Sequence, residues 1–348
     1  MLIHNLRLQN FGRTCYLNSV LQCLRYTHQL NNLMIELFNK VTKIHETDGD
    51  PVHKQIVINY LQVASIGTPH EANVSGTPDF DNHTVYAPVG LKHWLSTAIS
   101  IYQGHNEQDA HELLVNILDV FHQVYSCPVS ITETGCPVSS RDIKLKDSFV
   151  DYVKFYGNTH SIVVDLFMGQ FINIVACLSC GHKVYRYDPC TIFELPIAGT
   201  NLQDCLENYL DTEKIEYKCD RCNSTDNIVK KLAIWKMPKV LVVKLNRFTY
   251  DMKKITTKIQ FPHDLSLQPY IDADATPKDA EYQLYATICH TGAYGGGHYY
   301  AIVNTYDDQT KAGAVFLFND NNYQVIDPLQ MSDNPDTYMA FYRQQNLN

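Results

Sequence analysis

Residues 10–24 read NFGRTCYLNSVLQCL, and this stretch predicts the first helix of the fold and the place of a reactive thiol. Its apolar residues follow the i, i+3, i+4, i+7 spacing of a helix with one buried face: Leu17, Val20, Leu21 and Leu24. We expect a helix over 15–24 with Thr14 as its N-cap. Cys15 then begins the helix, where free N–H groups and the positive dipole end favour a thiolate. From the helix alone, a small apolar residue at the start of a core helix is the simpler interpretation.

A second helix and a later series of strands follow along the chain. Helical spacing recurs in residues 107–125 and predicts a helix there. Segments 65–84 and 126–140 are rich in turn formers and predict surface loops. After about residue 165, short β-branched and aromatic runs predict strands, interrupted by a loop at 268–281. Helices first and strands later indicate an α+β architecture.

The composition is that of a globular protein and excludes a polyanionic substrate. The 348 residues suffice for one large domain or two ordinary ones, and 45% of them are apolar. With 28 Lys and Arg against 37 Asp and Glu, the net charge of −9 should repel nucleic acid and acidic membranes. The sequence lacks a bilayer-spanning apolar stretch and a signal peptide. We therefore expect no membrane association and a location in the cytoplasm, the nucleus or both.

Cysteine spacing predicts a metal site. Eleven cysteines, an odd number, indicate free thiols and metal ligands rather than a disulfide framework. Cys177 and Cys180 form one Cys-x₂-Cys pair, and Cys219 and Cys222 form another after 38 intervening residues. Four thiolates suit a tetrahedral Zn²⁺ closed to water, so we expect one structural zinc. The remaining cysteines apart from Cys15 are expected to be buried free thiols: Cys23, Cys127, Cys136, Cys190, Cys205 and Cys289.

A nucleophilic cysteine needs a histidine to accept and return its proton, and a third group to orient the imidazole. Among 15 histidines, His298 stands at the start of an apolar strand, behind three glycines at 295–297 that allow another backbone to approach closely. We hypothesise that these glycines form a mobile lid. His290 is the second candidate base, with a structural role in shaping the loop as the simpler alternative.

These segments resemble the conserved boxes of the ubiquitin-specific proteases. Residues 10–19 are similar to the cysteine box of that family, and 295–302 to its Gly-His-Tyr-x-Ala box. Residues 316–320, Phe-Leu-Phe-Asn-Asp, resemble the strand that ends in the third catalytic member. The sequence departs from the family at Arg13, where Asn is usual. A fixed charge there could lower the pKa of the thiol, or the side chain could point to solvent.

The resemblance implies a role for each matching residue. Cys15 would be the nucleophile, His298 the base and acid, and Asn319 the residue that orients the imidazole, a task that Asp320 could share. Asn10 would donate a hydrogen bond to the oxyanion.

A further box, Asn106-Glu-Gln-Asp-Ala-His-Glu-Leu113, resembles the helix start whose acidic residues grip the substrate tail in that family. The matching positions are Gln108, Asp109 and Glu112. Carboxylates at i and i+3 share one helix face and could hold a basic extended peptide, although they could also complement the helix dipole. Tyr299 and Phe248 are candidates to line the channel for the last residues of the tail, with purely structural roles as the alternative.

The resemblance covers almost the whole chain and implies a single catalytic domain over 1–348. Its fold would be α+β, a papain-like cysteine protease shaped as a hand. A helical thumb would span about 1–125, zinc-bearing β fingers about 165–235, and an antiparallel palm sheet about 236–345.

The implied function is that of a deubiquitinating cysteine protease. Acting as a monomer on ubiquitin and ubiquitinated proteins, it would cut after the C-terminal glycine of ubiquitin through a thioester on Cys15. The alternatives are a catalytically weak or dead ubiquitin-binding scaffold, a protease for another ubiquitin-like modifier, and a cysteine hydrolase with a different acyl substrate. The intact residues Cys15, His298 and Asn319 favour an enzyme, and the paired cysteines and the Gln108 box favour ubiquitin.

Overall fold

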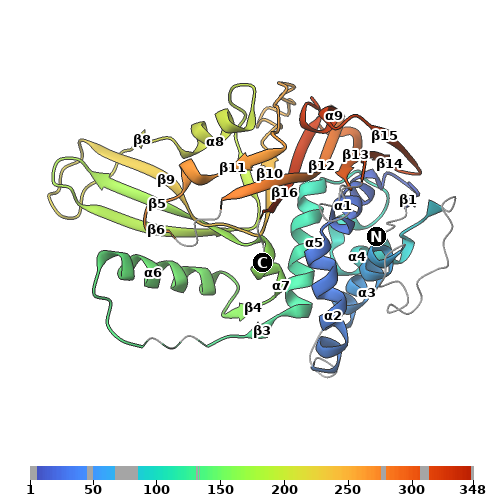
Figure 1. Cartoon of the computed structure of the whole chain (residues 1–348), viewed down its shortest axis with the longest axis horizontal. Coiled ribbons are helices and arrows are strands. Elements are labelled where there is room, and N and C mark those ends of the chain that lie inside the picture. The colour runs from blue at the N-terminus through green and yellow to red at the C-terminus, as the bar shows by residue number, and fades with distance from the viewer. Residues whose placement is uncertain are drawn as a thin grey trace.

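Most of the helices gather at one end of the molecule, and two sheets extend from them across the rest (Figure 1). The computed structural model describes residues 6–44, 50–66, 85–130, 132, 134–275, 280–305 and 313–345. Most of the loop expected at 65–84, from residue 67 on, lies outside these residues, as do 276–279 of the loop expected at 268–281. The α+β class expected from the sequence is confirmed.

Helix α1 (Cys15–Arg25) is the centre of the helical part, because every one of its side chains is buried. It packs against other helices on one side and against strands on the other. The helices around it are α2 (His28–Ile44), α3 (Pro51–Ser65), α4 (Val89–Ala98) and α5 (Ala110–Tyr125). The helix expected from residue 107 begins at Ala110, because the Asp109 carboxylate caps it.

Two helices that the sequence did not predict follow α5. Helix α6 (Ser140–Phe155) begins with a capping box, in which Ser139 and Asp142 each accept a hydrogen bond from the other's backbone N–H. Helix α7 (Ile162–Phe167) is short and largely buried. Helical structure thus continues well past residue 125, and α6 packs against the second sheet.

The larger sheet, here called the palm sheet, has the order β15-β14-β13-β12-β16-β10-β7, with β11 added beside β12. Its strands are β7 (Phe193–Leu195), β10 (Val240–Leu245), β11 (Asp264–Ser266), β12 (Glu281–Ala293), β13 (Gly296–Asn304), β14 (Val315–Asn319), β15 (Asn322–Ile326) and β16 (Thr337–Gln344). Its pairs are antiparallel as expected, except that β7 and β10 run parallel. Helix α1 packs on β12, β13 and β14, which brings the start of α1 to the ends of these strands.

The smaller sheet, here called the finger sheet, has the order β6-β5-β9-β8. Its strands are β5 (Gly169–Cys177), β6 (Lys183–Cys190), β8 (Glu213–Lys214) and β9 (Ile228–Lys236). Helix α8 (Leu202–Leu210) packs on β9 and β7. The shorter elements are β1 (Arg7–Leu8), β2 (Val85–Tyr86), β3 (Cys127–Pro128), β4 (Thr159–His160) and α9 (Leu329–Ser332).

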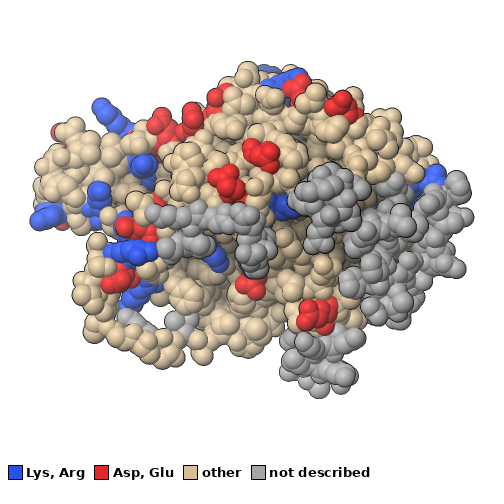
Figure 2. Space-filling model, viewed as in Figure 1, with Lys and Arg blue, Asp and Glu red and all other residues tan. Residues whose placement is uncertain are grey.

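The surface carries charges of both signs. On the face drawn in Figure 2, basic and acidic side chains lie interspersed over the finger sheet. Within the described part of the chain, none of the helices has the length and apolar character needed to cross a membrane.

Candidate active site

Cys15 is the first residue of α1, and its side chain is 5% exposed. The loop before it turns on the Asn10 side chain, whose Oδ1 accepts hydrogen bonds from the N–H groups of Gly12 (3.3 Å) and Thr14 (3.0 Å). Thr14 occupies the N-cap position as expected, but its hydroxyl accepts from the Phe11 N–H (3.3 Å) and makes no cap bond. The Thr14 hydroxyl therefore does not bind the first N–H groups of α1. The positive end of the helix dipole lies at the Cys15 thiol.

His298 on β13 reaches both Cys15 and Asn319. Its Nε2 lies 2.7 Å from Oδ1 of Asn319, and because an amide oxygen can only accept, Nε2 is the protonated donor. Nδ1 is then left for the thiol. The hydrogen bond to Cys15 is the main cause that raises the pKa of His298 to about 9; burial opposes the rise, and the Asn319 bond and the Asp320 charge add to it.

The second candidate base, His290, lies on the neighbouring strand but faces the other way. In the β12–β13 register Thr291 pairs with His298, and His290 pairs with Tyr299. Successive residues of a strand point to opposite faces of the sheet. Of the two histidines, the structure places His298 against Cys15.

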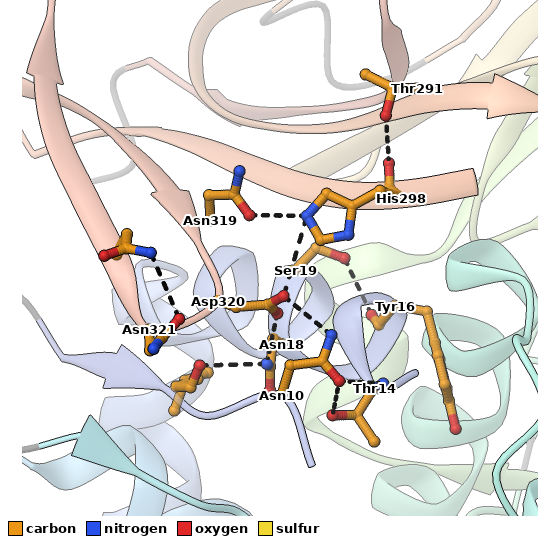
Figure 3. A network of polar contacts seen from close by, with 12 residues as sticks. Asn10, Thr14, Tyr16, Asn18, Ser19, Thr291, His298, Asn319, Asp320 and Asn321 are labelled. Carbon is orange, nitrogen blue, oxygen red and sulfur yellow. Dashed lines mark hydrogen bonds and ion pairs between the residues drawn. The ribbon is translucent and has the colours of Figure 1, made fainter. Parts of the chain in front are cut away.

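Asp320 joins the helical and sheet parts of the site (Figure 3). Its Oδ2 accepts a hydrogen bond from Nδ2 of Asn10 (3.0 Å), and its Oδ1 accepts one from Nδ2 of Asn18 (2.8 Å). Oδ2 also lies 3.9 Å from Nε2 of His298. A φ of 51° at Asp320, in the left-handed region that Asp tolerates better than most residues, forms the turn between β14 and β15. The carboxylate therefore holds Asn10 and His298 in one network.

Sequence reasoning missed Asn18. Its Nδ2 also lies 3.3 Å from the carbonyl oxygen of Leu8 and 3.2 Å from that of Gln9, so it ties the N-terminal segment to α1. The sequence pattern that could have identified Asn18 is its position about one helical turn after Cys15, on the face of α1 that the nucleophile occupies. A polar side chain that is 3% exposed needs partners, and Asp320 supplies one.

A cleft of about 250 Å³ opens beside Cys15, between the start of α5 and the β12–β13 hairpin. Four of the five predicted tail-binding residues line it: Gln108, Asp109, Phe248 and Tyr299. The fifth, Glu112, lines a groove of about 630 Å³ that shares Asp109 and Phe248 with the cleft. The two spaces therefore adjoin at these shared residues.

The two predicted carboxylates have different surroundings. Asp109 caps α5 by accepting from the N–H groups of His111 (2.7 Å) and Glu112 (3.3 Å), and it accepts from the Tyr338 hydroxyl (2.9 Å). The Asp109 carboxylate therefore lies at the positive end of α5 and complements the helix dipole, which was the alternative raised by the sequence. Glu112 lies in the first turn of α5. Gln108 donates to the Ile101 carbonyl at 2.7 Å.

Glu107 spans the cleft, a contact that the sequence did not predict. Its Oε2 accepts a hydrogen bond from the Gly297 N–H at 3.2 Å, and its Oε1 lies 3.9 Å from Nε of Arg13. The Arg13 side chain is 65% exposed, so its charge faces solvent and Glu107. The segment expected to be a mobile lid is thus held by Glu107 in this structure.

The four predicted metal ligands meet at the tip of the finger sheet. Their sulfur atoms all lie within 4.8 Å of one another. Sγ of Cys177 is 3.6 Å from Sγ of Cys222, and Sγ of Cys180 is 3.7 Å from Sγ of Cys219. Tetrahedral ligands at ~2.3 Å from Zn²⁺ would be about 3.8 Å apart, whereas a disulfide is about 2.05 Å long. The cluster can hold a metal ion.

The other cysteines are free thiols, but not all are buried. Cys23, Cys205 and Cys289 are buried as expected, and Cys190 is partly buried. Cys127 and Cys136 are exposed, so that expectation is wrong for both, because they lie in the surface segment between α5 and α6.

Comparison with known proteins gives a match along nearly the whole chain. The family model described as ubiquitin carboxyl-terminal hydrolase matches residues 6–342. Ubiquitin carboxyl-terminal hydrolase 4 of Saccharomyces cerevisiae is 26% identical over 96% of this chain and 39% of the relative. Ubiquitin carboxyl-terminal hydrolase 2 of Homo sapiens is 29% identical over 96% of this chain and 54% of the relative. The chain thus spans from about two fifths to just over half of these relatives.

Solved structures share the fold. A chain of the SAGA Ubp8/Sgf11/Sus1/Sgf73 DUB module bound to ubiquitin aldehyde superposes with a TM-score of 0.74 at 23% identity, over 99% of this chain and 70% of that chain. A chain of the same kind of module bound to monoubiquitin gives a TM-score of 0.73 at 23% identity and the same coverage.

Proposed function

Because the chain belongs to the ubiquitin carboxyl-terminal hydrolase family, we propose that it is a cysteine protease that hydrolyses the peptide or isopeptide bond after the C-terminal glycine of ubiquitin. The observation that carries the proposal is the position of His298, whose Nε2 is hydrogen-bonded to Asn319 and whose pKa is raised chiefly by its interaction with the Cys15 thiol. A thiol, an imidazole and an amide in this order are the parts that acyl transfer requires.

In the first half of the reaction, Sγ of Cys15 attacks the carbonyl carbon of the terminal glycine, and the carbonyl electron pair moves to the oxygen. His298 holds the thiol proton at Nδ1. When the tetrahedral intermediate collapses, the C–N bond breaks, the leaving amine takes this proton, and a thioester forms on Cys15. In the second half, water gives one proton to Nδ1 as it attacks the thioester. Collapse breaks the C–S bond, the sulfur takes the proton from Nδ1, and the released carboxylic acid loses its remaining proton to solvent.

Asn10 is proposed to stabilise the oxyanion. One hydrogen of its Nδ2 is donated to Asp320, and an amide carries two, so the second remains for the oxyanion. Because the amide oxygen is also held, by the N–H groups of Gly12 and Thr14, the side chain is preorganised before the charge develops.

The hand-like arrangement completes the proposal. The helices form the thumb, the finger sheet grips the body of ubiquitin, and the tail runs past Glu112 and Asp109 between α5 and the palm sheet. Phe248 and Tyr299 line its last part. We propose that the four finger cysteines hold one structural Zn²⁺. Action as a monomer in the cytoplasm or nucleus is part of this proposal.

Turnover tests the proposal against a binding scaffold. Wild-type protein should hydrolyse a ubiquitin C-terminal fluorogenic amide, and Cys15→Ala should bind ubiquitin without turnover. Fluorogenic amides of ubiquitin-like modifiers, assayed in parallel, test the substrate class. Binding without hydrolysis in the wild type would identify a scaffold, and faster hydrolysis of another modifier would reassign the substrate.

The alkaline limb of the pH profile tests the Asp320 charge. His298 has a raised pKa, so its protonated form, and the folding stability that comes with it, is complete below the ordinary histidine value and is lost as the pH rises through about 9. In Asp320→Asn this charge is removed, so the pKa of His298 falls and the alkaline limb of kcat/KM moves to lower pH.

Asn319→Asp is the matched variant, because it replaces the amide whose oxygen binds Nε2 of His298 with a carboxylate. Its alkaline limb should move to higher pH. Alkaline limbs that coincide in both variants and the wild type would show that His298 does not sense these charges.

A further inference from the structure

His290 lines the cleft but has no part in the proposed reaction. Its side chain is 5% exposed, and its ring lies between those of Tyr299 (centroids 4.6 Å apart) and Phe248 (5.5 Å). Its backbone is also fixed, since its N–H donates to the Asp336 carbonyl (2.9 Å) and its carbonyl accepts from Nζ of Lys254 (2.5 Å). The ring is therefore held in one place at the wall of the cleft that Cys15 also lines.

The two ring nitrogens of His290 differ in their surroundings. Burial, and after it the charge of Lys254, lowers the pKa of His290 to about 4, so the ring is neutral at physiological pH. Nδ1 is buried and has no hydrogen-bond partner among the described residues. A buried N–H without an acceptor is rarer in proteins than an acceptor without a donor. The single proton of the neutral ring is therefore placed on Nε2.

Nε2 lies at the edge of the ring that borders Gly297. A Cβ built on Gly297 would lie 2.4 Å from Nε2 and 2.8 Å from Cε1, so this edge touches the backbone of the β12–β13 hairpin. Gly297 also lines the cleft and directly precedes His298. A neutral N–H donor thus stands at the wall of the cleft, next to the strand segment that carries the base.

We propose that His290 is a substrate-binding residue whose Nε2–H donates a hydrogen bond to a backbone carbonyl of the ubiquitin tail. This inference rests on the proposed function and names one contact by which the same site holds its substrate. An extended tail that is buried in the cleft needs donors for its carbonyls. A neutral imidazole supplies one without placing a second positive charge beside His298.

Two substitutions separate the donor from the packing of the ring. His290→Phe keeps a ring of similar size and removes the donor, whereas His290→Gln can bring an amide N–H near the position of Nε2. With a ubiquitin fluorogenic amide, kcat/KM should fall roughly five- to ten-fold in His290→Phe, the effect of one hydrogen bond, and stay within about two-fold of wild type in His290→Gln. Both should keep the wild-type pH profile, since His290 stays neutral across the assay range.

Affinity in the Cys15→Ala background supplies a readout without turnover. There, His290→Phe should weaken binding of full-length ubiquitin by a similar factor and leave unchanged the binding of ubiquitin that lacks its C-terminal residues. Equal losses in the Phe and Gln variants, or a Phe variant equal to wild type, would overturn the inference and leave His290 with a packing role. A wild-type protein that binds ubiquitin without hydrolysing it would refute the proposed reaction, while this binding comparison would still decide the role of His290.

Discussion

His298→Ala should lower kcat for ubiquitin hydrolysis by about four to six orders of magnitude. In the proposed reaction the imidazole holds the thiol proton and later gives it to the leaving amine, and loss of the base in comparable triads has an effect of about this size. The change removes a side chain that is about one third exposed, so the fold should persist. Steady-state kinetics, with an unfolding curve for each variant, measure both points.

Asn319→Ala is the graded control for His298→Ala. It should lose less activity, because Oδ2 of Asp320 lies 3.9 Å from Nε2 of His298 and can take over part of the orienting role. Equal losses in the two variants would argue against sharing by Asp320. A His298→Ala protein that keeps more than about a hundredth of wild-type kcat would exclude His298 as the base.

Loss of the proposed zinc should destabilise the finger sheet. Structural zinc binds to small domains with about 10–16 kcal/mol, and the four sulfurs at the finger tip have a spacing that fits the ion. Cys219→Ser removes one of the four proposed ligands, a cysteine that is 1% exposed. We expect the unfolding temperature to fall by about 5 °C or more, since even a small share of the metal's binding energy has this effect in a domain of this size. Ubiquitin binding should weaken with it.

Metal analysis and a matched cysteine control complete that experiment. The purified wild type should contain one zinc per chain, and a chelator should reproduce the effect of Cys219→Ser. Cys136→Ser, which changes an exposed cysteine outside the cluster, should keep the metal and the unfolding temperature. A wild type without metal, whose unfolding temperature a chelator leaves unchanged, would refute a structural zinc.

The sequence predicted those parts of the fold and site that depend on short-range patterns. Apolar spacing located α1 and α5 to within a few residues, and the order of helical and strand patterns gave the α+β class. The family followed from boxes that are each local in sequence. The two Cys-x₂-Cys pairs predicted a cluster because four thiols at that spacing have few other uses. The roles of Cys15, His298 and Asn319 in catalysis stay predictions, although the structure brings the three together.

The rest could not be predicted because it depends on which distant segments meet. Asn18 and Asp320 are 302 positions apart, and the link between Glu107 and Gly297 spans 190. The Asp109 carboxylate lines the cleft and caps α5, both of which the sequence raised, but its hydrogen bond from the Tyr338 hydroxyl joins residues 229 positions apart. Contacts of this kind arise only when the helices pack on the palm sheet.

Trapping with a ubiquitin that carries a C-terminal electrophile tests most directly whether Cys15 is the nucleophile that receives the ubiquitin tail. In the wild type we expect one ubiquitin per chain, attached to Cys15 as identified by peptide mass spectrometry, and no adduct in Cys15→Ala. The exposed thiols of Cys127 and Cys136 serve as internal controls, because a non-specific electrophile would modify them first. An adduct on either of these, or an unlabelled wild type that still binds ubiquitin, would contradict the account.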